Sequence, residues 1–153
     1  SLKLSGNDLK IINSSISGDT TIGGLSRIES DLEEHKPNYV LVELGGNDAL
    51  RGYPINKIKS NLLKIIDVSF AAKANPIIMQ IRIPPNYGKN YVVAFESIYT
   101  QIAKEKNIPM LTFLLEKVAL DKSLMQLDGI HPNQKAQQII ANQVEKELLI
   151  ILK

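Results

Sequence analysis

The sequence predicts an α/β fold built around a parallel sheet, and three features of the chain support this. Short apolar runs of strand length alternate with longer stretches of helical periodicity. Polar and glycine-rich loops follow the apolar runs. No internal repeat or linker divides the 153 residues, which is an ordinary length for one domain. We therefore expect residues 1–153 to form a single α/β domain.

Two strands and one helix are expected in the first third of the chain. The apolar pattern at 10–13 predicts a strand that leads into the loop Ser17–Thr20. A helix is expected over Ile22–His35, and it ends there because Pro37 disfavours a helical conformation at the residue before it. The run Tyr39–Leu44 is mostly apolar, which predicts a strand buried on both faces.

The rest of the chain continues this alternation. A helix is predicted over Ile55–Lys73, because apolar residues recur there at helical spacing. Strands are expected at Ile77–Ile81 and at Pro109–Leu111, with a helix over Tyr91–Lys106 between them, and a last helix starts near Asn133. The predicted apolar faces of the second and the last helix are Ile58, Leu62, Ile65, Ile66 and Ser69, and Ala136, Ile139, Ile140, Val144, Leu148 and Ile151.

Three loops mark the expected position of a functional site. The loops Ser17–Thr20, Gly45–Asp48 and Ile83–Gly88 are each expected to follow a strand. In a parallel sheet the carboxyl ends of the strands share one edge, so we expect the three loops to gather there. Open α/β sheets bind their ligands at this edge.

Composition argues against several classes of function. The 18 basic and 16 acidic side chains are interleaved along the chain, which disfavours a nucleic-acid-binding face. The sequence has no cysteine and two histidines, so thiolate chemistry is excluded and a zinc site is disfavoured. No apolar run has the length of a membrane-spanning helix, so stable membrane insertion is not expected, and no signal peptide is visible.

Asp128 and His131 are the candidate acid–base residues. They lie in the segment Asp128–Asn133, where a glycine and a proline favour a tight turn. Such a turn brings the carboxylate beside the imidazole, as in a hydrolytic triad. An alternative remains open, in which Asn133 merely caps the last helix and His131 is an exposed loop residue. His35, at the end of a helix, is expected to be a surface residue.

Asn47 and Gly18 are candidate hydrogen-bond donors to an oxyanion. The Asn47 side-chain amide follows a strand, and the glycines before it would let a substrate approach the backbone. The backbone N–H of Gly18 could serve the same oxyanion. Each segment, taken alone, is better explained as an ordinary turn. The combination with Asp128 and His131 is what points to a serine hydrolase.

Three segments of the chain resemble the SGNH (GDSL) hydrolases. Ser15–Thr20, Val42–Asp48 and Asp128–Asn133 are similar to blocks II, III and V of that family, most of all to its bacterial acyl-CoA thioesterases and lysophospholipases, which are arylesterase-like. The resemblance implies a flavodoxin-like, three-layer α/β/α domain without a metal or cofactor. It makes Asp128 and His131 catalytic and Gly18 and Asn47 the oxyanion donors. It also assigns substrate binding to Gly46, Leu50, Arg51, Ile83, Pro84, Pro85 and Tyr87, and it predicts that the segments 49–54 and 83–88 line the acyl pocket.

The family's first block, Gly-Asp-Ser-Leu, is absent from the printed sequence. Ser5–Asp8 does not replace it, because no strand precedes that segment, and we nominate no serine as the nucleophile. We expect the first strand and the serine to lie upstream in a longer protein; strand exchange with a second chain and an inactive, truncated homologue are the alternatives.

The expected activity is therefore the hydrolysis of small acyl-ester substrates, namely acyl esters, lysophospholipids or the thioester acyl-CoA, by a serine–histidine–aspartate triad. Two other functions remain open: a non-catalytic acyl-binding module and a carbohydrate O-acetylesterase. The resemblance points to a periplasmic or secreted protein, and the sequence leaves the oligomeric state undetermined.

Overall fold

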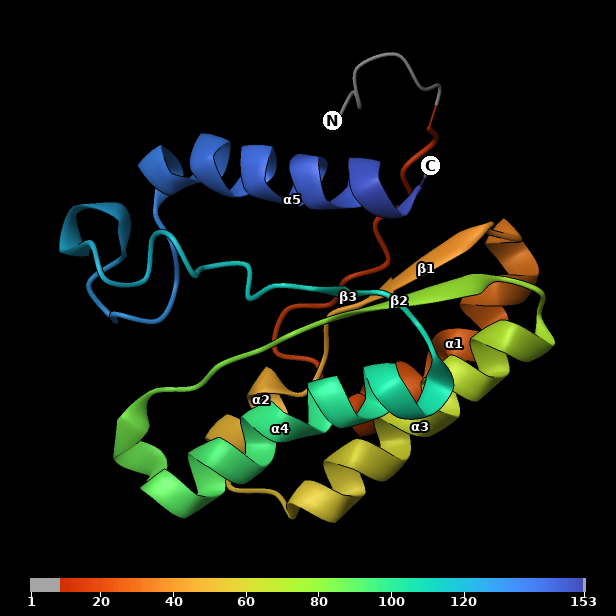
Figure 1. Ribbon diagram of the computed structural model, residues 1–153, viewed down its shortest axis with the longest axis horizontal. Coiled ribbons are helices and arrows are strands. Elements are labelled where there is room, and N and C mark those ends of the chain that lie inside the picture. Colours follow the sequence, from red (N-terminus) through yellow and green to blue (C-terminus); the bar gives the residue numbers. More distant parts are fainter. Residues whose placement is uncertain (1–8, 153) are drawn as a thin grey trace. The chain divides into compact units, whose positions relative to one another are not determined.

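The computed structural model describes residues 9–152, whose contacts divide them into two compact units. The first unit comprises residues 13–110, and the second comprises residues 111–152 together with 9–12. Along the first unit the elements are α1 (Thr21–His35), β1 (Tyr39–Val42), α2 (Gly46–Leu50), α3 (Ile55–Ala71), β2 (Asn75–Met79), the short 3-10 helix η1 (Pro85–Tyr87) and α4 (Lys89–Lys106) (Figure 1). The strand β3 (Met110–Leu111) lies where the chain passes into the second unit.

The sheet is parallel, as predicted. β1 pairs with β2 in parallel from Tyr39↔Asn75 to Val42↔Ile78, and the strand order is β1-β2-β3. The backbone N–H of Ile78 donates to the Pro109 carbonyl at 3.1 Å. The helices α3 and α4 pack against β2, and Figure 1 shows both on the same side of the two paired strands. The α/β class is thus confirmed, whereas the three-layer arrangement and the single domain stay predictions.

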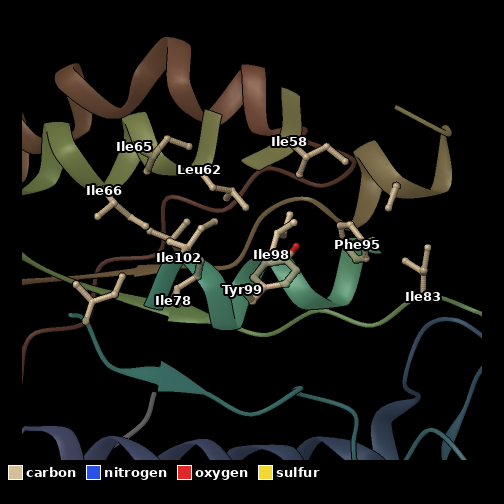
Figure 2. Packing of buried hydrophobic residues seen from close by; sticks show 13 residues of the cluster. Ile58, Leu62, Ile65, Ile66, Ile78, Ile83, Phe95, Ile98, Tyr99 and Ile102 are labelled. Atoms are coloured by element: carbon tan, nitrogen blue, oxygen red, sulfur yellow. The ribbon is translucent and has the colours of Figure 1, made fainter. Parts of the chain in front are cut away.

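The core of the first unit lies between α3, α4 and the strands (Figure 2). All five residues of the predicted apolar face of α3 are buried. α4 contributes Phe95, Ile98, Tyr99 and Ile102, and the rings of Phe95 and Tyr99 meet edge to face with centroids 5.4 Å apart. Burying a side chain of this size stabilises a fold by roughly 1.5–3 kcal/mol, so this cluster is the main source of stability in the unit.

α1 begins and ends at residues that suit helix termini. Thr20 is extended, and its side chain accepts a hydrogen bond from the Gly23 N–H at 3.4 Å, as an N-cap residue does. At the other end Lys36 adopts a left-handed conformation with φ 46°, directly before Pro37. The helix predicted over Ile22–His35 is therefore confirmed to within one residue.

The strand predicted at Lys10–Asn13 is wrong. Residues 10–13 form neither helix nor strand, and the side chains of Ile11 and Ile12 are exposed. A strand exists only through pairing, and within residues 9–152 no strand pairs with this segment. The loop Ser17–Thr20 consequently follows no strand. The segment Ser5–Asp8 lies outside the described residues.

β1 is a strand, but the prediction that both its faces are buried is wrong. Val42 is buried and Val40 packs on the core, while Tyr39 and Leu41 are 42% and 41% exposed. Successive side chains of a strand point to opposite faces, and the core of this unit covers the face of Val40 and Val42. An apolar residue pattern cannot by itself distinguish a strand covered on one face from one covered on two.

Other boundaries differ by a few residues. The loop predicted at Gly45–Asp48 contains the start of α2, and the loop at Ile83–Gly88 contains η1. The strand predicted at Ile77–Ile81 begins two residues earlier, at Asn75, because its pairing with β1 extends to that residue.

The second unit contains two 3-10 helices, η2 (Lys122–Leu124) and η3 (Gln134–Ala136), and the helix α5 (Gln137–Ile151). Asn133 caps η3, since its side chain accepts from the Lys135 N–H at 2.9 Å. Of the predicted apolar stripe, Ala136, Ile140 and Val144 are buried, but Ile139 is 39% exposed. Ile139 lies about 100° around the helix from Ile140, which places it off the buried i, i+4 row.

Candidate active site

Asp128 and His131 form a hydrogen-bonded pair, as the sequence predicts. The Asp128 Oδ2 atom lies 2.7 Å from Nδ1 of His131. The other carboxylate oxygen, Oδ1, accepts from the backbone N–H groups of Ile130 at 2.9 Å and His131 at 3.0 Å. The carboxylate thus fixes both the backbone of the turn and the orientation of the imidazole ring.

Backbone hydrogen bonds also stabilise the turn that carries Asp128 and His131. The Gln126 N–H donates to the His131 carbonyl at 2.8 Å, and the Gly129 N–H donates to the Gln126 carbonyl at 3.0 Å. Gly129 has φ +67°, in the region that favours glycine. Asn133 donates from its side-chain amide to the carbonyls of Ser123, at 2.8 Å, and Met125. These bonds fix the backbone around His131, which lies two residues before Asn133, the N-cap of η3.

Hydrogen bonding keeps Asp128 ionised. The backbone N–H of His131, then its imidazole, then the backbone N–H of Ile130 lower the pKa of Asp128 to about 2. The side chains of His131 and Asp128 remain 68% and 45% exposed. The sequence left two alternatives, an Asp128–His131 pair or a helix cap at Asn133 with His131 exposed. Both hold in part, since Asn133 caps η3 and Asp128 also orients the imidazole.

The loop Ser17–Thr20 presents Gly18 in an open position. Gly18 has φ +77° and is exposed, and no atom lies within 4 Å of the place where a side chain would begin. Its carbonyl accepts a hydrogen bond from Arg51 Nη2 at 3.2 Å. Asp19 is anchored to α1 by Arg27, with Nη2 3.1 Å from the Asp19 carboxylate. The loop is therefore tied to both α1 and the end of α2.

The segment Gly45–Asp48 turns the chain sharply from β1 into α2. Gly45 has φ +114°, and a side chain there would begin 2.5 Å from the Tyr99 hydroxyl. That hydroxyl donates to the Leu44 carbonyl at 2.9 Å. Burial, aided by the charges of Asp48 and Glu43, raises the pKa of Tyr99, so the hydroxyl keeps its proton for this bond. Asn47, the second residue of α2, is half-buried.

Asp48 and Thr21 form a buried contact that no pattern in the sequence predicts. The Asp48 carboxylate accepts from the Thr21 hydroxyl at 2.6 Å and from the Thr21 backbone N–H at 2.8 Å. Asn61 on α3 donates to the same hydroxyl at 3.0 Å. The residues lie 27 apart in sequence, so no local spacing pattern signals the contact; the only available clue is an acidic residue beside Asn47.

The residues assigned to the acyl pocket have different surroundings. Ile83 is buried and belongs to the core cluster, and Leu50 packs against that cluster. A side chain at Gly46 would begin 3.5 Å from Ile81. Arg51 is exposed, as are Pro85 and Tyr87, whereas Pro84 is half-buried. The pocket itself stays a prediction.

The structure brings the predicted site residues together in two groups. The loop of Gly18 and the helix of Asn47 are joined through Arg51 and through the contact of Thr21 with Asp48. Asp128 and His131 are joined to each other in the second unit. His35, the other histidine, lies in the last turn of α1, 3.8 Å from Glu34, and belongs to neither group.

Among the described residues, no group of three or more histidine or acidic side chains is arranged to hold a metal ion. No helix within residues 9–152 has the length and apolar character needed to cross a membrane.

A parallel α/β fold with a hydrogen-bonded aspartate–histidine pair is an architecture shared by many hydrolases that use a catalytic triad. The chain belongs to the GDSL-like Lipase/Acylhydrolase family, whose sequence model matches residues 2–139. This confirms the family resemblance drawn from the three segments.

Named relatives agree with this assignment. The chain is 49% identical over 138 residues to "Thioesterase 1/protease 1/lysophospholipase L1" of Escherichia coli K12, covering 90% of this chain and 66% of the relative. It is 46% identical to an arylesterase of Vibrio mimicus, covering 94% of this chain and 72% of that protein. The chain thus spans about two thirds of the length of the Escherichia coli relative. Among solved structures, the psychrotrophic esterase EstA from Pseudoalteromonas sp. matches with a TM-score of 0.92 and 42% identity, covering 95% of this chain and 79% of that one.

Proposed function

We propose that the protein hydrolyses acyl esters and thioesters, including lysophospholipids and acyl-CoA. The observation that carries the proposal is the Asp128–His131 pair, with 2.7 Å between the carboxylate and Nδ1. The family and the names of the relatives, which include a thioesterase, a lysophospholipase and an arylesterase, support the same chemistry.

In this proposal His131 is the general base. With Nδ1 held by the Asp128 carboxylate, its other ring nitrogen, Nε2, is free to take the proton of a serine hydroxyl. The serine comes from a Gly-Asp-Ser-Leu segment that the 153 residues do not include. Its Oγ attacks the acyl carbonyl, His131 then protonates the leaving alcohol or thiol, and the acyl-enzyme is hydrolysed by water. Asp128 stabilises the imidazolium that forms and stays ionised throughout.

Gly18 and Asn47 serve as oxyanion donors in this reaction. Gly18 would donate its backbone N–H and Asn47 its side-chain amide to the oxygen that becomes negative when the serine adds. One such donor contributes roughly 3 kcal/mol to stabilisation of the transition state. The open surroundings of Gly18 and the partial exposure of Asn47 support this role, because a substrate must reach both groups.

The acyl chain would lie against the segments 49–54 and 83–88. Six of the seven residues assigned to substrate binding lie in these segments, and Gly46 lies at the start of α2. Near the start of α4 the Tyr91 hydroxyl donates to the Tyr53 carbonyl at 2.7 Å, which ties the first segment to that helix. Such a surface suits medium or long acyl groups better than an acetyl group, because each added buried CH₂ stabilises binding by about 0.8 kcal/mol.

The test is turnover of p-nitrophenyl esters, from acetate to palmitate, by the full-length protein and its His131→Ala variant. We expect His131→Ala to lower kcat by about 10⁴-fold or more. His35→Ala is the matched control, because His35 lies in the last turn of α1, at the opposite end of that helix from the loop of Gly18, and its kcat should match that of the wild type.

Other results would support the alternatives. Equal kcat for the wild type and His131→Ala would remove His131 from the mechanism. Fatty-acid binding without turnover or fluorophosphonate labelling would indicate an acyl-binding module. A strong preference for acetyl over longer chains would favour an O-acetylesterase.

A further inference from the structure

We propose that Asp48 is a positioning residue that holds the two oxyanion donors, Gly18 and Asn47, in fixed relation to each other. The inference rests on the proposed hydrolytic function of these donors and assigns a role to a residue beside them. Asp48 directly follows Asn47 in α2, and Thr21, its hydrogen-bond partner, lies three residues after Gly18. A link between Asp48 and Thr21 is therefore also a link between the two donor segments.

The link is buried and doubly hydrogen-bonded. Asp48 is 2% exposed and Thr21 is fully buried. One carboxylate oxygen accepts from the Thr21 hydroxyl at 2.6 Å, and the other accepts from the Thr21 backbone N–H at 2.8 Å. Hydrogen bonds to an ionised group are shorter and stronger than those between neutral groups, and burial protects them from water.

The position of Thr21 explains how the fold tolerates a buried carboxylate. Thr21 is the first residue of α1, so its N–H is one of those that an α-helix leaves without an internal partner. A negative charge at this end is stabilised by the helix dipole. Asp48 thus acts on α1 from another element, and α1 in turn fixes the end of the loop that carries Gly18.

Two neighbouring contacts support the positioning role of Asp48. Asn61 donates to the Thr21 hydroxyl at 3.0 Å, so the proton of that hydroxyl is directed to Asp48. Arg51, at the end of α2, donates to the Gly18 carbonyl at 3.2 Å. The Arg51 contact is exposed and the Asp48 contact is buried, so Asp48 supplies the stiffer of the two connections between α2 and the loop.

The consequence for catalysis follows from geometry. An oxyanion hole works only when its donors point at the place where the charge develops. A misplacement of about 1 Å can lower the rate about 100-fold. Loosening the link should therefore reduce kcat, because the donors act in the transition state, and leave KM nearly unchanged.

The experiment compares four variants of the full-length protein. Asp48→Ala removes both hydrogen bonds, Thr21→Val removes only the hydroxyl, and Asp48→Asn keeps the shape and one acceptor. Ser69→Ala is the matched control, since Ser69 is also buried and hydrogen-bonded, to the Ile65 carbonyl at 2.8 Å, within α3. Steady-state kinetics and thermal unfolding are measured for each.

We expect Asp48→Ala to lower kcat by about 100-fold and Thr21→Val by about tenfold, with KM changed less than about threefold. Asp48→Asn should recover part of the loss, and Ser69→Ala should lose stability without losing kcat. Values of kcat for Asp48→Ala and Thr21→Val within about twofold of Ser69→Ala would overturn the inference.

Amide hydrogen exchange separates this inference from the proposed function. A wild type that hydrolyses no ester would refute the proposed function but not the positioning role of Asp48. In either case Asp48→Ala should speed amide exchange in the segments 18–21 and 46–49 by about tenfold or more, while the amides of Ile65 and Ile78 stay protected. Unchanged exchange in both segments would overturn the positioning role on its own.

Discussion

Gly45→Ala is the substitution whose effect the structure defines most closely. Gly45 has φ +114°, and an added Cβ would lie 2.5 Å from the Tyr99 hydroxyl, 3.4 Å from Ile58 and 3.6 Å from Phe95. The Tyr99 ring is fully buried and cannot swing aside into solvent, as its place in the core shows (Figure 2). The tyrosine must therefore move within a packed core, and its hydrogen bond to the Leu44 carbonyl is lost.

Three contributions set the magnitude. A non-glycine residue at this φ costs about 1–3 kcal/mol. Loss of the buried hydrogen bond costs about 1 kcal/mol. Overpacking of the core adds about 1–3 kcal/mol. We therefore expect Gly45→Ala to lower the free energy of unfolding by roughly 3–7 kcal/mol, which is a large fraction of the stability of an ordinary domain.

Urea denaturation followed by circular dichroism measures this loss, and two companion variants separate its causes. Gly52→Ala is the control for backbone strain, because Gly52 has φ +70° with no atom within 4 Å, and it should cost only about 1–2 kcal/mol. Adding Tyr99→Phe to Gly45→Ala removes the clashing oxygen and should recover part of the loss. If Gly45→Ala costs no more than Gly52→Ala, the proposed clash with Tyr99 does not occur.

Three further predictions concern the site and the core. Asn47→Ala should lower kcat about 10²–10³-fold with little change in KM, and ester kinetics showing an unchanged kcat would exclude Asn47 as an oxyanion donor. The carboxyl carbon of Asp128 should titrate by NMR with a pKa of about 2, against an ordinary value of 3.8. Because the pKa of Asp128 is lowered in the folded state, the hydrogen bonds to its carboxylate stabilise the fold above about pH 3.8, and this stabilisation is lost as the pH falls through about 2. His131→Ala should raise the titration midpoint of Asp128, and an unchanged midpoint would show that the imidazole does not contribute to the lowered pKa. Leu62→Ala, at a fully buried position, should destabilise by about 2–5 kcal/mol, whereas exposed Val93→Ala should stay within about 0.5 kcal/mol, and similar losses for the two would contradict the core assignment.

Local patterns in the sequence predicted the parts of the structure that depend on near neighbours. The five buried residues of α3 recur at helical spacing, so its apolar face could be read directly from the chain. Asp128 and His131 are three residues apart in a turn, and their pairing could be anticipated for the same reason.

Features that depend on distant partners could not be read in this way. The segment 10–13 has a strand-like composition, but strand formation requires a partner that no local pattern supplies. The contact of Asp48 with Thr21 joins residues 27 apart, and the contact of Tyr99 with Leu44 joins residues 55 apart. Only the packing of α1, α2 and α4 brings these groups together, so their role in shaping the site emerged from the structure.

A crystal structure of the full-length protein with a phosphonate bound to its serine would test the hydrolase proposal most directly. We predict that the phosphonyl oxygen accepts from the Gly18 N–H and the Asn47 amide, while Nε2 of His131 lies within hydrogen-bond distance of the serine Oγ. A phosphonate that binds elsewhere, or an imidazole of His131 that faces away from it, would contradict the proposal.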